Sequence, residues 1–100
     1  MSSTIVACAT GPVRAGISIV RVSGPKAAAI GEKVCKKALG APNHTAYRSL
    51  HDKSGTLIDK GLVVLFKAPA SFTGEDVIEL QTHGSPFIVD QVIASCIAHG

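Results

Sequence analysis

Residues 71–84 read SFTGEDVIELQTHG, and they are the most informative segment of this 100-residue chain. Successive side chains of a β-strand point to opposite faces. A strand over residues 76–83 therefore places Ile78, Leu80 and Thr82 on one face. The opposite face carries mostly polar residues, namely Val77, Glu79, Gln81 and His83. We expect the first face to join the core and the second to form a binding surface.

The residues before this segment predict two strands and a helix. Residues 4–9 and 17–23 are rich in β-branched side chains, and the stretch between them, TGPVRAG, is typical of a turn or loop. Pro25 suits the first position of a helix, and apolar residues recur after it at spacings of three and four. We expect an amphipathic helix over residues 25–39, ended by Gly40. Its apolar positions are Ala27, Ile30, Val34 and Ala38.

The second half predicts further strands and a final helix. Residues 45–52 and 56–66 are predicted strands joined by a Lys-Ser-Gly turn, and the strand over residues 76–83 follows. The final helix begins at Pro86, with Ser85 as its N-cap, and ends at Gly100. Its predicted buried stripe is Val89, Val92, Ile93, Cys96 and Ile97, with Asp90, Gln91 and Ser95 on the other side.

The element order ββαβββα predicts an α+β domain with a mixed or largely antiparallel sheet of about five strands and two helices. The length fits one domain. Hydrophobic residues make up 46% of the chain and charged residues 17%, a composition that excludes a disordered tail. We therefore expect the chain to fold.

The charge and cysteine patterns exclude several functions. The net charge is +3, and the ten basic residues are scattered, so they form no nucleic-acid-binding stripe, although a weak attraction to RNA is permitted. The three cysteines lack the spacing of zinc or redox sites and are expected to be small core residues of a reducing compartment. No leader or membrane-spanning run is present, so we expect a cytoplasmic protein without a metal site.

Arg21 and Glu79 are the candidate binding residues. Arg21 shares a strand face with Ile17 and Ile19, where a charge is unexpected unless a partner pairs with it. One explanation is a structural ion pair with a carboxylate such as Glu79. The other is a cavity in which both side chains address a polar ligand, since a carboxylate can accept paired hydrogen bonds from a ring N–H and an amino group.

Catalytic and phosphate-binding motifs are missing from the sequence. Neither Gly-rich stretch matches a phosphate-binding loop, and no Ser-His-Asp or Cys-His arrangement stands out. His83 is expected to be a strand-end residue hydrogen-bonded to the adjacent loop. We therefore expect no catalytic residue in this chain.

Two segments, ATGPVRAGISIVRVSGP at residues 9–25 and SFTGEDVIELQTHG, resemble the N-terminal domain of the tRNA modification GTPases called MnmE or TrmE. The resemblance implies a fold similar to the folate-binding domain of aminomethyltransferases, binding of a formyl-tetrahydrofolate one-carbon donor, and homodimerisation. Carried over by position, the folate contacts fall on Arg21 and Glu79.

The resemblance also implies what the whole family protein does. It is a GTPase that uses GTP, potassium and magnesium in a separate domain and modifies the wobble uridine of tRNA with the flavoprotein MnmG (GidA). Residues 1–100 would be a truncated folate-binding and dimerisation domain, with the helical and GTPase domains and a further folate contact beyond them. Val13, Ala15 and Ser85 depart from glycines of the family pattern, which bears on close backbone approach to a ligand near Arg14.

Two alternatives stay open at this point. The chain could be a self-association module whose polar face is a subunit interface, with Arg21 and Glu79 forming an ion pair. It could also be part of a folate-dependent aminomethyltransferase-like protein.

Overall fold

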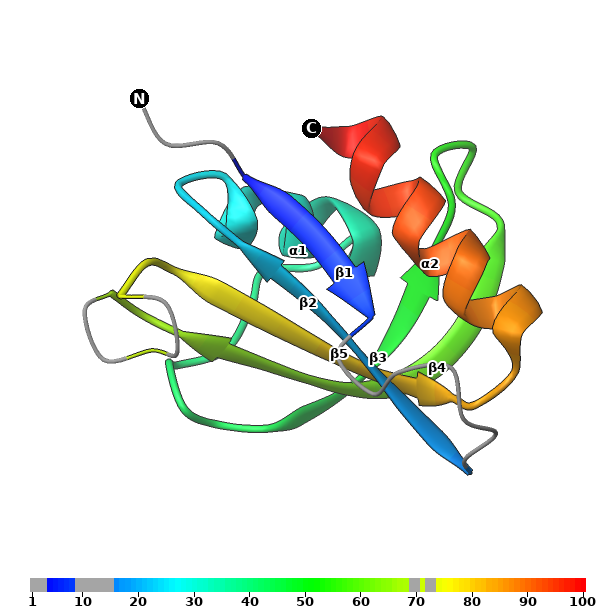
Figure 1. The fold of residues 1–100 in the computed structure, drawn as a ribbon, viewed down its shortest axis with the longest axis horizontal. Coiled ribbons are helices and arrows are strands. Elements are labelled where there is room, and N and C mark those ends of the chain that lie inside the picture. Colours follow the sequence, from blue (N-terminus) through cyan, green and yellow to red (C-terminus); the bar gives the residue numbers. More distant parts are fainter. Residues whose placement is uncertain (1–3, 9–15, 69–70, 72–73) are drawn as a thin grey trace.

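The fold is a five-stranded antiparallel sheet with two helices packed on one face, seen in a computed structural model that describes residues 4–8, 16–68, 71 and 74–100 (Figure 1). The sheet order is β1-β2-β5-β4-β3, and all four strand pairings are antiparallel. The elements are β1 (Ile5–Cys8), β2 (Ile17–Ser23), α1 (Ala27–Cys35), β3 (Ala46–His51), β4 (Leu57–Phe66), β5 (Val77–His83) and α2 (Pro86–His99). The predicted α+β class, element order and strand number are confirmed.

The hydrophobic core lies between the sheet and the two helices. Alternate residues of the central strands point into it: Val20 and Val22 from β2, Ile78 and Leu80 from β5, and Val63 from β4. The helices contribute Ala27, Ile30, Val34, Cys35, Val89, Val92 and Cys96. The predicted core face of β5 is confirmed, since Ile78 and Leu80 are fully buried and Thr82 is 2% exposed.

The second face of the sheet, which we call the open face, carries the other alternate residues. The register pairs Arg21 with Glu79 and Glu79 with Val64, so these three residues lie in one row across β2, β5 and β4. Ile17 lies on the same face and is 57% exposed. The face that Arg21 shares with Ile17 and Ile19 is therefore the one that the helices leave uncovered, so the charge does not enter the core.

Gly61 lets the main chains of β4 and β5 approach each other closely. A methyl group at this position would overlap the main-chain carbonyl oxygen of Gln81 and would lie 3.0 Å from its carbonyl carbon. The regular pairing of β4 with β5 ends one residue away, at Leu62. Only glycine leaves room for this approach.

The first helix is shorter than its sequence pattern predicts. It spans Ala27–Cys35, whereas the predicted range was 25–39, and Pro25 precedes it instead of occupying its first turn. Lys36 adopts a left-handed conformation with φ 55°, and the main-chain N–H of Lys37 bonds the carbonyl of Glu32. This C-terminal cap ends the helix before Gly40.

The last helix has the predicted boundaries, and Val89, Val92 and Cys96 are buried as predicted, but Ile97 and Ser95 exchange their predicted environments. Ile97 is 65% exposed, whereas Ser95, predicted to face outward, is 3% exposed. The Ser95 hydroxyl donates a 2.6 Å hydrogen bond to the carbonyl of His51 at the end of β3. This bond satisfies the buried hydroxyl, so the polar side chain can face the sheet. No helix among the described residues is long and apolar enough to cross a membrane.

Candidate functional site

The two candidate binding residues meet on the open face of the sheet. Arg21 lies in the middle of β2 and Glu79 in the middle of β5, and the antiparallel register places them directly opposite each other. The Nε–H of Arg21 donates a 2.8 Å hydrogen bond to Oε1 of Glu79, across 58 residues of sequence. The expected pairing of these residues is thus present within one chain.

Solvent reaches the arginine of this pair more than the glutamate. The Glu79 side chain is 9% exposed and the Arg21 side chain 37%. A carboxylate this deep needs a partner, because an unpaired buried charge is costly. Among the described residues, the Glu79 oxygen Oε2 accepts no hydrogen bond. The arginine therefore fixes the orientation of the Glu79 carboxylate through its other oxygen, Oε1.

A shallow hollow lies on the same face, toward the far end of β5. It has a volume of about 210 Å³ and lies between the start of β2, the middle of β4, the end of β5 and the edge strand β3. Its lining residues are Ile17, Tyr47, Lys60, Gly61, Leu62, Gln81, Thr82 and His83. Three apolar side chains there are exposed, Ile17 at 57%, Tyr47 at 65% and Leu62 at 38%. The open face therefore combines a polar pair with uncovered apolar surface.

His83 bonds a strand rather than the adjacent loop, contrary to the sequence prediction. The carboxylate of Asp59 in β4 accepts hydrogen bonds from the His83 main-chain N–H at 2.9 Å and from its Nδ1 at 2.9 Å. Burial acts to raise the pKa of Asp59, but the main-chain and side-chain hydrogen bonds from His83 outweigh it, so the pKa lies below its ordinary value. The pair fastens the end of β5 to β4.

The cysteines agree with the structural role predicted for them. Cys35 and Cys96 are buried and unbonded to each other, and burial raises the pKa of Cys35 to about 11 and of Cys96 to about 12. Cys8 is partly exposed. The described residues contain no group of three or more potential metal ligands. The loop around Val13, Arg14 and Ala15 lies outside the described residues.

Sequence reasoning missed Gly61 and Asp59, which together shape the end of this face. Gly61 lies within the predicted strand over residues 56–66. A glycine inside a strand often marks a close approach of another main chain, so the sequence did contain an indication of this contact. Asp59 lies in the same predicted strand with no local pattern that points to His83.

The described residues define an α+β domain with a polar pair on the open face of an antiparallel sheet. The chain belongs to the family described as GTP-binding protein TrmE N-terminus, whose family model matches residues 4–100.

Relatives named tRNA modification GTPase MnmE match nearly the whole chain. The protein from Legionella pneumophila (strain Paris) is 51% identical over 100 residues, covering 97% of this chain and 22% of the relative. The protein from Janthinobacterium sp. (strain Marseille) is 46% identical over 101 residues, covering 99% of this chain and 22% of the relative. That from Pseudomonas putida (strain W619) is 43% identical over 97 residues, covering 97% and 21%. The chain thus spans about a fifth of the length of these relatives.

Proposed function

We propose that this chain is the N-terminal domain of a tRNA modification GTPase and that it binds a formyl-tetrahydrofolate one-carbon donor through Arg21 and Glu79. The observation that carries the folate part is the 2.8 Å pair of these residues on the open face, in which Arg21 bonds only one of the two Glu79 oxygens. The family match supports the tRNA modification context.

The chemistry of the pair fits a pterin ring. The edge of a pterin presents a ring N–H beside an amino group, and a carboxylate accepts both in a two-point contact. The Arg21 guanidinium fixes the orientation of the Glu79 carboxylate through their hydrogen bond, and Arg21 is the proposed contact to a polar group of the same ligand. In this proposal formyl-tetrahydrofolate supplies the one-carbon unit, and the chain's own residues bind and orient it.

The same proposal includes homodimerisation through the open face. Ile17, Tyr47 and Leu62 present apolar surface there, and side chains of this kind form the buried centre of subunit interfaces. GTP, potassium, magnesium, tRNA and the flavoprotein MnmG belong in this proposal to the larger protein, for which wobble uridine is the target. This chain contributes no catalytic residue to it.

Calorimetric titration with 5-formyl-tetrahydrofolate tests the folate site. Hydrogen bonds to a charged group contribute about 1.5–3 kcal/mol each, so Glu79→Gln should weaken binding by at least about tenfold. Asp90→Asn removes one carboxylate from the exposed side of α2 and is the matched control, expected to leave affinity unchanged. Equal affinity of wild type and Glu79→Gln would remove Glu79 from the site.

A pure self-association module is the second candidate. The observation that favours it is the Arg21–Glu79 bond itself, which pairs the two charges within the chain without any ligand. Sedimentation velocity with and without the folate separates the two readings. A dimer that never binds the folate, also when extended past Gly100, would favour the module. The aminomethyltransferase-like alternative is less well supported, because the family match names TrmE.

A further inference from the structure

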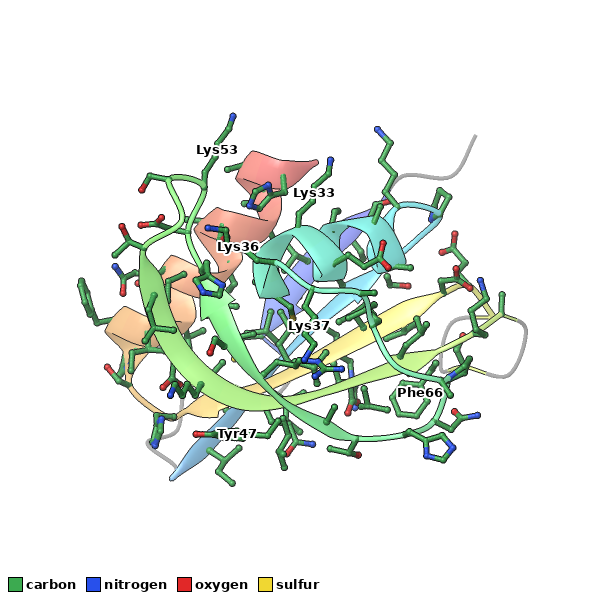
Figure 2. The ribbon with its side chains drawn as sticks, turned by 180° about the vertical axis from the view of Figure 1, so that it is seen from behind. Lys33, Lys36, Lys37, Tyr47, Lys53 and Phe66 are labelled. Atoms are coloured by element: carbon green, nitrogen blue, oxygen red, sulfur yellow. The ribbon has the colours of Figure 1, made fainter. Side chains whose placement is uncertain are left out.

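The fold gathers basic side chains that look scattered in the sequence. Lys33 lies in the last turn of α1, Lys36 and Lys37 follow it directly, Arg48 lies in the edge strand β3, and Lys53 lies in the turn between β3 and β4. Figure 2 shows the labelled lysines around the C-terminal end of α1 and the neighbouring turn, with Tyr47 further along β3. We call this set the basic cluster.

A hollow of about 310 Å³ opens within the basic cluster, away from the Arg21–Glu79 pair. It is lined by Cys35, Lys36, Lys37, Tyr47, Arg48, Ser49 and His51. Three of these residues are cations, and Tyr47, at 65% exposure, lies at the rim of the hollow, where the edge strand β3 turns its side chain to the opposite face from Arg48. The combination of cations, a hydroxyl and an exposed aromatic ring suits an anionic ligand that also carries a flat ring.

Within the described residues, no ion pair neutralises a cation of the basic cluster. The ion pairs Arg21–Glu79, Lys67–Asp76 and His83–Asp59 all lie elsewhere. Two carboxylates lie on the same elements as the cluster, Glu32 and Asp52. Five cations against these two leave a surplus of three positive charges, equal to the net charge of the whole chain.

Asp52 is already engaged by its own turn. Its Oδ1 accepts hydrogen bonds from the Ser54 hydroxyl at 2.8 Å and from the main-chain N–H groups of Ser54 and Thr56 at 3.0 and 2.9 Å. Glu32, an exposed residue of α1 four positions before Lys36, makes no ion pair in the part of the chain that the structure describes. Neither carboxylate therefore forms an ion pair with a cation of the hollow in the described structure.

The helix dipole accounts for only part of this arrangement. The negative C-terminal end of α1 attracts cations, which explains lysines in and after its last turn. It does not explain Arg48 and the exposed Tyr47, which come from the edge strand on the other side of the hollow.

We infer that this hollow binds the phosphodiester backbone of single-stranded RNA, with Lys36, Lys37 and Arg48 on the phosphates and Tyr47 stacked on a base. Cationic grooves with exposed aromatic residues bind single strands in this way. The inference rests on the proposed function for the choice of RNA over other polyanions. It shares Tyr47 with the proposed dimer interface but uses neither Arg21 nor Glu79, so the RNA site and the folate site can fail independently.

Fluorescence anisotropy with a labelled twelve-nucleotide oligouridine tests the inference on the 100-residue chain. Each phosphate contact to a single strand contributes about 0.7 to the slope of log affinity against log salt, so Lys37→Ala/Arg48→Ala should lower that slope by about 1.4. The charge-matched control is Lys26→Ala/Lys67→Ala, which removes two exposed cations that line neither this hollow nor the one beside Tyr47, and it should leave the slope near wild type. Tyr47→Ala should weaken binding at least about fivefold, and Tyr47→Phe should not.

Three results would overturn the inference: no RNA binding at low salt, equal losses in the two double variants, or binding of phosphatidylglycerol vesicles in place of RNA. Amide chemical shifts of the wild-type chain provide a test that needs no variant to fold. RNA should move the resonances of residues 35–37 and 47–51, and movement confined to other regions would contradict the site. Loss of folate binding in Glu79→Gln with RNA binding intact would leave this inference standing.

Discussion

Replacing Gly61 with alanine should destabilise the domain more than any other glycine-to-alanine change away from a turn. The added methyl group would overlap the Gln81 carbonyl oxygen and lie 3.0 Å from its carbon, whereas ordinary contacts of such a carbon begin near 3.4 Å. Main chain cannot rotate out of the way as a flexible side chain can. β4 must therefore move away from β5 at this position.

The expected cost follows from two contributions. Forcing an extra methyl group into a packed site costs about 1–3 kcal/mol. The movement of β4 also strains the 2.9 Å hydrogen bond that the His83 main-chain N–H donates to Asp59, which lies two residues before Gly61. Hydrogen bonds to charged groups contribute about 1.5–3 kcal/mol. Because His83 is largely exposed, we count only part of the second term and expect a total of about 3 kcal/mol.

Urea unfolding followed by circular dichroism measures this cost. With an m value of about 1.5 kcal/mol/M, the midpoint should fall by about 2 M. Gly40→Ala is the control, since a methyl group there meets nothing within 4 Å, and it should change stability by less than about 0.5 kcal/mol. Matching midpoints for the two variants would refute the close approach of β4 to β5.

Three further predictions concern buried and paired groups. Ser95→Ala should cost about 1–2 kcal/mol in urea unfolding, because it leaves the His51 carbonyl without its 2.6 Å donor; a neutral effect would contradict that bond. Folding lowers the pKa of Asp59, so its carboxylate stabilises the fold at pH values above its unfolded pKa, and this stabilisation is lost as pH falls through the folded pKa. The difference in unfolding free energy between wild type and Asp59→Asn should therefore shrink below about pH 4. A difference that does not change with pH would argue against the Asp59–His83 pair. At pH 8, iodoacetamide should label Cys8 before Cys35 and Cys96, because burial raises the thiol pKa of Cys35 to about 11 and that of Cys96 to about 12. Equal labelling rates in the folded state would show that Cys35 and Cys96 are not buried.

Period-two patterns predicted the strands well, because each central strand buries one face against the helices. β2 was placed at its observed bounds, and the core face of β5 was identified from three residues. The end of the first helix was harder to predict from the sequence. A left-handed lysine ends α1, and nothing in the local sequence marks Lys36 for a conformation usually taken by glycine.

The candidate site was predictable in its residues but not in its geometry. Arg21 and Glu79 are separated by 58 residues, and their contact depends on β2 pairing with β5, two strands that are not consecutive in the chain. Only that topology and its register bring the two side chains into one row. The basic cluster was missed for the same reason, because α1 and β3 contribute cations from separate parts of the sequence.

The most direct test of the folate site is the Arg21 Nε–H resonance in ¹⁵N-labelled protein titrated with 5-formyl-tetrahydrofolate. This proton bonds Glu79 at 2.8 Å, so a ligand held by that carboxylate must change its environment. We expect this resonance and the amides of residues 77–81 to shift together and saturate, with residues 35–37 unmoved. Saturating ligand that leaves the Arg21 side-chain signal in place would contradict the proposed site.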